Sequence, residues 1–248
     1  MGIQVIYSDA GDVDCASIPL LWKGIPDVNV IRLARDTNYT KEDVRKAIAE
    51  CDDTLIMCGH GTPSGLLGIC AVPRKPMAVR RGAQASPRMS MAQMYAMAKN
   101  KNDANVAGNL GEMVKPETET EQVPETEVQY DHEMTFAVDA SMVPDIHADR
   151  VIAVWCNANM FAEKHHLYGF WSSMFISNSG EARYMGIYNV PQEVIVSETY
   201  KFWRDANVLL KNNVPLDEWI DRLVAVGNMD YPTTKYNYDG LRYYPKTK

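Results

Sequence analysis

Four short apolar runs constrain the fold of this chain most strongly, because each has the length and composition of a buried β-strand. They cover residues 3–8, 28–33, 54–59 and 150–155. The first three lie within the first 60 residues and are separated by stretches with helical character. Strands that alternate with helices are typical of a parallel sheet. The sequence therefore predicts an α/β fold with these four runs at its core.

Helices are predicted between and after these runs. A short one is expected at 16–23 and another at 41–50, where Thr40 and Asp43 occupy the two positions of a capping box. Three more are expected later in the chain, at residues 159–167, 191–211 and 216–226. Additional short strands are expected at residues 134–139, 173–177 and 184–188. The aromatic and polar tail, 231–244, is expected to follow the surface.

Residues 72–130 interrupt this alternation. All charged residues from 74 to 101 are basic, whereas a tract rich in Glu, Thr and Pro follows at 115–127. Such a composition buries little apolar surface. We therefore expect one domain, residues 1–248, with an insertion or long loop at about 72–130. A plain surface excursion and a regulatory segment are equally compatible with this pattern.

A histidine and a cysteine follow two of the predicted core strands. His60 lies between two glycines after the run 54–59, and Cys156 directly follows the run 150–155. The carboxyl edge of an open α/β sheet is where ligands bind, so neighbouring parallel strands would bring both side chains to one site. An imidazole can activate a thiol as its base. Taken singly, each residue is also explained as a core thiol or a loop histidine.

This pattern resembles the caspase-like cysteine peptidases, which include caspases, metacaspases, legumains, gingipains, clostripain and separases. The resemblance implies a caspase-like (flavodoxin-like) fold: a mainly parallel central sheet with helices on both faces. It also implies that Cys156 is the nucleophile and His60 the general base, with the backbone N–H groups of Gly61 and Cys156 as the oxyanion hole. Two features differ. Asn157 follows the cysteine where family members commonly have Arg or Ser, and the His60–Cys156 interval is about twice the roughly 50 residues expected of caspases.

Acidic residues follow the first strand. In the resembled family this loop often lines the pocket for the residue before the cut, so Asp9, Asp12 and Asp14 would favour Arg or Lys there. An ordinary solvated loop explains the same residues, and their spacing lacks the rest of a calcium-binding loop. Asn157 and Asn159 could orient His60, or cap the helix that follows; capping is the better explanation of Asn159.

Charge and cysteine content narrow the expected partners and compartment. The net charge of −7 argues against nucleic acid as a partner, because phosphate binding needs clustered cations. No apolar run approaches the roughly 20 residues of a membrane span, and no secretory leader is recognised after Met1. The five cysteines lack paired spacing, so we expect reduced thiols in a cytoplasmic protein, with no metal and no other cofactor.

These features together predict a cysteine endopeptidase that acts on a protein or peptide substrate. Cleavage after Arg or Lys is expected, and the basic segment at 74–101 is itself a candidate for self-cleavage because it is tethered near the site. A non-catalytic domain that binds a partner protein or a small signal molecule at the same sheet edge is the alternative. A fold alone does not separate the two.

Overall fold

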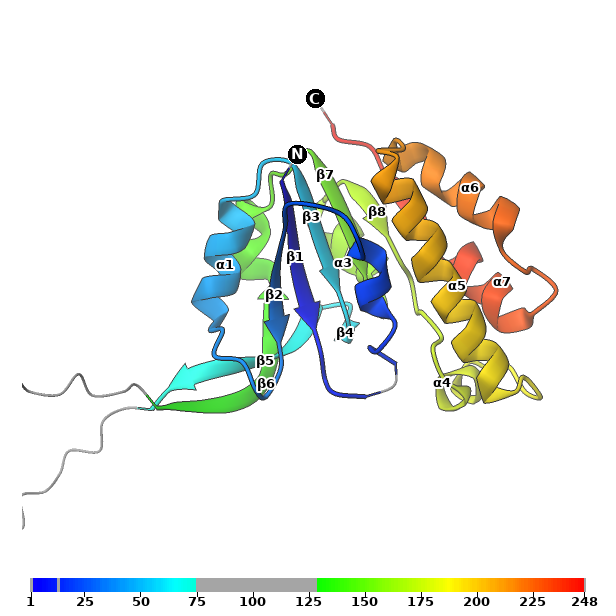
Figure 1. Ribbon diagram of the computed structural model, residues 1–248, viewed down its shortest axis with the longest axis horizontal. Coiled ribbons are helices and arrows are strands. Elements are labelled where there is room, and N and C mark those ends of the chain that lie inside the picture. Colours follow the sequence, from blue (N-terminus) through cyan, green and yellow to red (C-terminus); the bar gives the residue numbers. More distant parts are fainter. Residues whose placement is uncertain (1, 13, 75–128, 248) are drawn as a thin grey trace, which may run out of the picture. The chain divides into compact units, whose positions relative to one another are not determined.

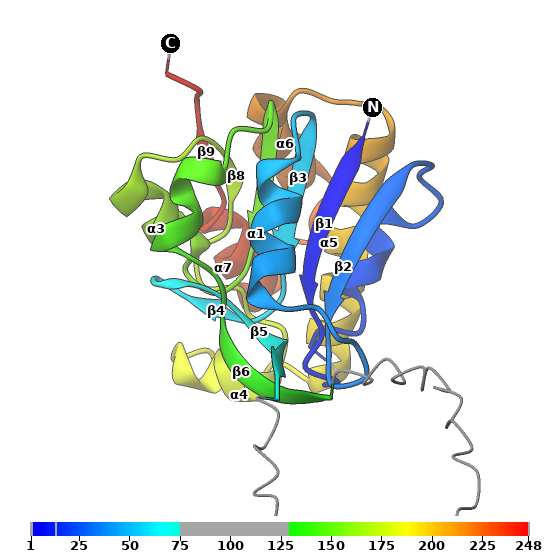
Figure 2. The same cartoon turned by 90° about the vertical axis from the view of Figure 1, so that its left-hand side faces the viewer.

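A six-stranded sheet forms the centre of the protein in a computed structural model, which describes residues 2–12, 14–74 and 129–247. The sheet belongs to a compact unit made of Met1–Val72 and Tyr130–Lys248. Figures 1 and 2 show this sheet between helices on both of its faces. Its strands follow the order β2 (Val28–Leu33), β1 (Ile3–Ser8), β3 (Thr54–Cys58), β7 (Arg150–Val154), β8 (Gly169–Trp171) and β9 (Arg242–Tyr244).

The first five strands of this order are parallel, and β9 runs antiparallel to β8. The four predicted core strands are therefore confirmed as neighbours in one sheet. The chain places β2 on one side of β1 and then crosses to place β3 on the other. This is the strand order of flavodoxin-like folds, in which ligands bind where the order reverses. Here that position is the carboxyl edge between β1 and β3.

The apolar run of β3 is continuous because the sheet is covered on both faces. All its residues are buried. Leu55 and Met57 pack into the core on one face, and Ile56 and Cys58 pack into the core on the other. Successive side chains point to opposite faces of a strand, so one short run supplies both cores.

Different parts of the chain cover the two faces (Figures 1 and 2). The face of Leu55 is covered by α1 (Lys41–Ala49), η2 (Ala140–Asp145) and α3 (Ala158–His165). The opposite face is covered by η1 (Ile18–Trp22), α5 (Gln192–Lys211), η3 (Leu216–Glu218), α6 (Trp219–Val226) and α7 (Pro232–Asp239). The predicted helices at 16–23, 41–50, 159–167, 191–211 and 216–226 are thus confirmed to within two residues at most ends.

The start of α1 follows from its sequence. Thr40 accepts a hydrogen bond from the backbone N–H of Asp43, and the Asp43 carboxylate accepts one from the N–H of Thr40. This reciprocal capping satisfies two N–H groups that have no partner within the helix. Val44 and Ile48, four residues apart, then bury one face of the helix against the sheet.

A second, three-stranded sheet consists of β4 (Gly61–Thr62), β5 (Gly65–Pro73) and β6 (Tyr130–Asp139). The expected strand at 134–139 lies within β6. The hairpin of β4 and β5 was not predicted, because its glycine-rich start is typical of a loop. Apart from its ends, the predicted insertion at 72–130 lies outside the described residues, as do the basic and acidic segments within it.

Three expectations for the last third of the chain are wrong. Residues 173–177 form no strand, because the backbone of Ile176 is bonded to the amide of Asn237 on α7. Residues 184–188 form the end of α4 (Ser179–Tyr184) and a turn. The tail is not a surface wrap: it forms α7, which buries Tyr238, and the edge strand β9. Local sequence predicts secondary structure poorly in this part of the chain, because hydrogen bonds to distant residues determine the path of the backbone.

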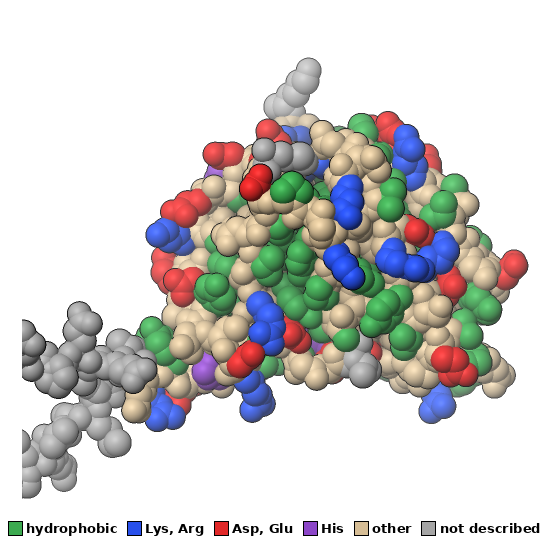
Figure 3. Space-filling model, viewed as in Figure 1, with side chains coloured by type: hydrophobic (Ala, Val, Ile, Leu, Met, Phe, Trp, Pro, Cys, Tyr) green, Lys and Arg blue, Asp and Glu red, His purple; other side chains and the backbone are tan. Residues whose placement is uncertain are grey.

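The surface of this unit mixes side chains of every kind. Figure 3 shows apolar side chains gathered near the centre of one face, with basic and acidic side chains interspersed around them. Among the described residues, none of the helices is both long and apolar enough to cross a membrane.

Candidate active site

The loops after β1, β3 and β7 meet at the carboxyl edge of the sheet. Tyr7 of β1 is level with Cys58 of β3, and Cys58 is level with Val154 of β7. Residues just beyond these positions therefore emerge side by side. His60 and Cys156 both line one pocket at this edge, together with Asp14 and Cys15. The pairing of His60 and Cys156 at one site is the arrangement expected from their places after neighbouring strands.

His60 is held by an acidic residue from the loop after β1. Its Nε2 lies 2.6 Å from Oδ2 of Asp12. Burial favours the neutral form of Asp12, but hydrogen bonds from His60 and from the backbone N–H of Cys15 outweigh it and lower the Asp12 pKa. An ionised carboxylate only accepts hydrogen bonds, so this contact places the imidazole proton on Nε2. The other ring nitrogen, Nδ1, is then free to accept a proton.

Cys156 lies between β7 and α3 and is partly buried. Its thiol donates a hydrogen bond to the carbonyl of Phe175 at 3.8 Å, and no hydrogen bond joins it to His60 in the described part of the chain. Burial raises the pKa of Cys156 to about 11, and the nearby carboxylates of Glu181 and Asp14 act in the same direction. In this state the thiol is protonated at neutral pH.

The lining of the pocket includes several polar groups without a hydrogen-bond partner among the described residues. Oδ1 of Asp14, the hydroxyl of Thr199 and the indole N–H of Trp203 are buried and lack a hydrogen-bond partner among the described residues. Glu181 also lines the pocket, and its carboxylate accepts bonds from the N–H and hydroxyl of Ser177. Unpaired buried polar atoms are costly. Asp14 and Thr199 can accept hydrogen bonds here, whereas the indole of Trp203 can only donate one.

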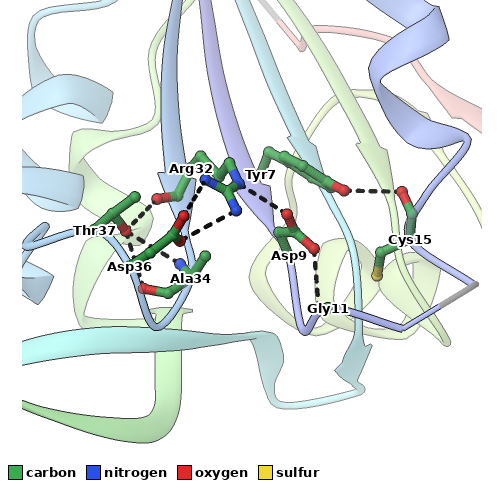
Figure 4. A network of polar contacts seen from close by, with 8 residues as sticks. All are labelled: Tyr7, Asp9, Gly11, Cys15, Arg32, Ala34, Asp36 and Thr37. Atoms are coloured by element: carbon green, nitrogen blue, oxygen red, sulfur yellow. Dashed lines mark hydrogen bonds and ion pairs between the residues drawn. The ribbon is translucent and has the colours of Figure 1, made fainter.

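The three acidic residues predicted to line the pocket occupy different environments. Asp14 lines it, with Oδ2 accepting from the side-chain amide of Asn178 at 2.8 Å. Asp12 faces His60. Asp9 instead points to Arg32 of β2, with its Oδ2 2.8 Å from Nε of that arginine, as Figure 4 shows. Of the three, Asp14 is the one that lines the pocket shared by His60 and Cys156.

Gly61 allows the loop after β3 to pass close to a tryptophan. A Cβ atom at this position would lie 2.1 Å from Cδ1 of Trp155, and Trp155 donates its indole N–H to the carbonyl of Thr62. The carbonyl of His60 accepts from the N–H of Leu67. Because bonded and non-bonded pairs alternate in an antiparallel ladder, the N–H of Gly61 turns away from β5. Gly61 is thus both a packing requirement and a source of one available backbone donor.

Of the two asparagines after Cys156, Asn157 occupies the N-cap position of α3 and Asn159 does not. Asn157, in the left-handed conformation with φ 65°, precedes the first residue of α3 but makes no side-chain capping bond. Asn159 lies inside the helix, and its side-chain oxygen is buried without a partner in the described chain. Capping by Asn159 is therefore wrong. The side chain in contact with His60 is Asp12, for which the sequence suggests a substrate pocket or an ordinary solvated loop.

Several pocket residues were not singled out from the sequence. Glu181 looks like a capping residue, since it stands three positions after Asn178, the N-cap of α4. Thr199 and Trp203 are four residues apart on α5 and so share a helix face, which is the ordinary pattern of a core. Cys15 looks like one more buried thiol. What distinguishes these residues from ordinary core and capping residues is that they line the same pocket as Cys156.

Possible metal ligands gather at one place among the described residues. Asp12, Cys15 and His60 form one group of three, with ligand atoms that all lie within 4.8 Å of one another. The acidic residues Asp9 and Asp14 do not belong to it.

Neither a protein-family model, nor a curated protein, nor a solved structure matches this chain.

Alkylation of the unliganded protein gives a direct test of the thiol environment. We expect iodoacetamide to modify Cys156 before the four buried cysteines, at a rate that rises roughly tenfold per pH unit from neutral pH towards the raised pKa, because the thiolate is the nucleophile. Peptide mapping by mass spectrometry over a pH series measures this. A rate that is already flat at neutral pH would contradict the protonated resting state.

Proposed function

We propose that this protein is a cysteine endopeptidase with Cys156 as nucleophile and His60 as general base. The observation that carries the proposal is that both side chains line one pocket at the carboxyl edge of adjacent parallel strands, with His60 fixed by a 2.6 Å contact to Asp12. A nucleophile, a base and a group that orients the base are the three parts that covalent acyl transfer needs.

The reaction follows from these positions. Nδ1 of His60 takes the proton of the Cys156 thiol as sulfur attacks the substrate carbonyl carbon. The Asp12 carboxylate stabilises the imidazolium that forms. The backbone N–H groups of Gly61 and Cys156 bind the oxyanion, and the N–H of Gly61 is supported in this role because it points away from β5. Collapse of the tetrahedral intermediate expels the amine with the proton from His60, and water then hydrolyses the thioester.

The protonated resting thiol is compatible with this sequence of steps. Glu181 and Asp14 both act to raise the Cys156 pKa. A positively charged substrate side chain seated beside these carboxylates would offset their effect. The thiol would then ionise more readily when a suitable substrate is bound than in the free protein.

A preference for Arg or Lys before the cut follows from the same pocket. Asp14 and Glu181 bring two carboxylates to its wall, and Thr199 adds a buried hydroxyl without a partner in the described chain. A guanidinium or ammonium group satisfies such acceptors, whereas an apolar side chain leaves them unpaired. We therefore propose that Asp14 and Glu181, and not Asp9, bind the cationic side chain of the substrate.

Substitution of Asp14 tests this assignment. Asp14→Asn keeps the size of the side chain and removes its charge, so kcat/KM for an Arg or Lys peptide should fall about tenfold or more relative to a leucine peptide. Asp9→Asn is the matched control, because Asp9 is paired with Arg32 and should leave this ratio unchanged. Equal effects of the two variants on the ratio would remove Asp14 from the pocket's recognition of charge.

The class of reaction is tested with a peptidyl electrophile. A peptide ketone with arginine at the position before the reactive carbon and a leaving group on that carbon should form a thioether with Cys156, identified by mass spectrometry. Labelling should be blocked by a competing arginine peptide amide. Modification spread over several cysteines, or none at Cys156, would oppose the peptidase proposal.

The contact of Cys156 with the Phe175 carbonyl favours a second candidate. With its thiol protonated and bonded to a backbone oxygen, the pocket can act as a non-catalytic binding site for a cationic peptide or small molecule. Such a module would bind an arginine peptide without cleaving it, and Cys156→Ala would bind it equally well. Self-cleavage at 74–101, a cytoplasmic location and the absence of a nucleic-acid partner stay predictions.

A further inference from the structure

We propose that Asp12, Cys15 and His60 form a binding site for one divalent transition-metal ion of the zinc class. The three residues come from two loops at the carboxyl edge of the sheet, the first after β1 and the second after β3. Their ligand atoms, a carboxylate oxygen, a thiol sulfur and an imidazole nitrogen, all lie within 4.8 Å of one another.

The donor set selects the class of ion. Zinc binds through thiolate, imidazole and carboxylate, whereas calcium and magnesium require oxygen ligands. One thiolate and one carboxylate would neutralise a dication, with a neutral imidazole as the third ligand. Three protein ligands leave the fourth tetrahedral position open for a water molecule or another ligand. Two of the three, His60 and Cys15, also line the pocket.

The loop after β1 is held so that two of the ligands face the third. The hydroxyl of Tyr7 donates to the carbonyl of Cys15 at 2.8 Å (Figure 4), and Oδ1 of Asp12 accepts from the N–H of Cys15. These bonds tie Cys15 to Tyr7 through its carbonyl and to Asp12 through its N–H. Oδ2 of Asp12 remains directed at His60.

Small movements would convert this cluster into a coordination site. Metal–ligand bonds of about 2.0–2.3 Å require ligand atoms roughly 3–4 Å apart. The 2.6 Å contact between His60 and Asp12 must therefore open slightly, and the thiol of Cys15 must approach. His60 and Asp12 are partly exposed, with 32% and 40% of their side chains accessible, so rotation of the imidazole and the carboxylate is unhindered by a packed core.

The charges of the cluster also suit a cation. A thiolate at Cys15 beside the carboxylate of Asp12 would bring two anions close together, because their ligand atoms lie within 4.8 Å of one another. A dication between them removes that repulsion, and binding releases the thiol proton to solvent.

A bound ion would also switch off the proposed chemistry, an inference that rests on the proposed function. Coordination through Nε2 leaves the proton of a neutral imidazole on Nδ1. His60 then has no lone pair with which to take the proton of Cys156. The ion would thus act as a reversible inhibitor that lies between Asp12 and His60 and occupies the nitrogen that Asp12 contacts in the metal-free protein.

The binding of cobalt and zinc to the full chain tests the site without an activity assay. After treatment with a chelator, the protein should take up one Co²⁺ with a thiolate-to-metal charge-transfer band in the near ultraviolet, and Zn²⁺ should displace it. Cys15→Ser should abolish the band, and both Cys15→Ser and His60→Ala should weaken Zn²⁺ binding at least tenfold. Competition with a chromophoric chelator measures the affinities.

Two cysteine variants serve as controls. Cys156→Ser removes the other thiol in the pocket, and Cys70→Ser removes a buried thiol on the opposite face of the sheet. Both should retain the band and the affinity. If Cys15→Ser does not fold, His60→Ala decides the question, because its side chain is partly exposed and lies in a loop.

Three results would overturn the proposal: no stoichiometric uptake of Co²⁺, a band lost in Cys156→Ser but kept in Cys15→Ser, or Zn²⁺ affinity unchanged in His60→Ala.

The test of the metal site is separate from the test of the peptidase. Uptake of metal by a protein that shows no hydrolysis would keep the site and discard the peptidase. Hydrolysis that micromolar Zn²⁺ fails to inhibit, in a protein shown to bind it at the three residues, would discard the inhibition alone.

Discussion

Replacing Cys156 with alanine is expected to abolish hydrolysis of an Arg or Lys peptide, with kcat/KM lowered by about 10³-fold or more. The reason is chemical: without sulfur no thioester forms, and His60 has no proton to accept. The fold should persist, because the side chain is only partly buried and its hydrogen bond to the carbonyl of Phe175 is long. Steady-state kinetics with a fluorogenic peptide, alongside circular dichroism, measures both.

A second cysteine supplies the control for that experiment. Cys51 precedes β3 at the opposite edge of the sheet and is buried, so Cys51→Ala removes a thiol of the same kind away from the pocket. It should lower the free energy of unfolding while leaving the activity of the folded protein unchanged. Full activity in Cys156→Ala would rule the mechanism out, and the binding alternative would then account for the pocket.

Gly65→Ala should be among the most destabilising single substitutions in the second sheet. Gly65 has φ +145°, and a Cβ atom there would lie 2.0 Å from the carbonyl oxygen of Val138 on β6. Both the backbone conformation and the contact are unavailable to alanine, and a backbone carbonyl cannot rotate aside as a side chain does. We expect a loss of about 3 kcal/mol or more in the free energy of unfolding.

Gly186→Ala separates the two contributions. Gly186 also has positive φ, +76°, but a Cβ atom there meets nothing within 4 Å. Its substitution should cost about 1–2 kcal/mol, the price of the left-handed conformation alone. Urea unfolding with equal m-values compares the two variants. Equal losses would show that β5 and β6 do not approach as closely as described.

Tertiary packing determines that the segment after His60 forms the hairpin of β4 and β5. The sequence shows the glycines of this segment but not the contacts that require them. Glycines beside a histidine are typical of a flexible catalytic loop. Here the close approach of Trp155 to Gly61, and of Val138 to Gly65, requires glycine at each point. These contacts join segments more than 70 residues apart, and no local pattern reports them.

By itself, the sequence determined the four core strands, the capping box of α1, and the places of His60 and Cys156 after adjacent strands. Each follows from short-range physics: apolar runs of strand length, a reciprocal cap three residues apart, and the rule that parallel strands share a carboxyl edge. The tertiary structure alone decided which side chains face them. Asp12 reaches His60, Asp14 and Glu181 meet at the pocket, and Asp9 turns to Arg32. Those contacts depend on how crossovers bring distant loops together, a choice made by packing of the whole core and not by any one segment.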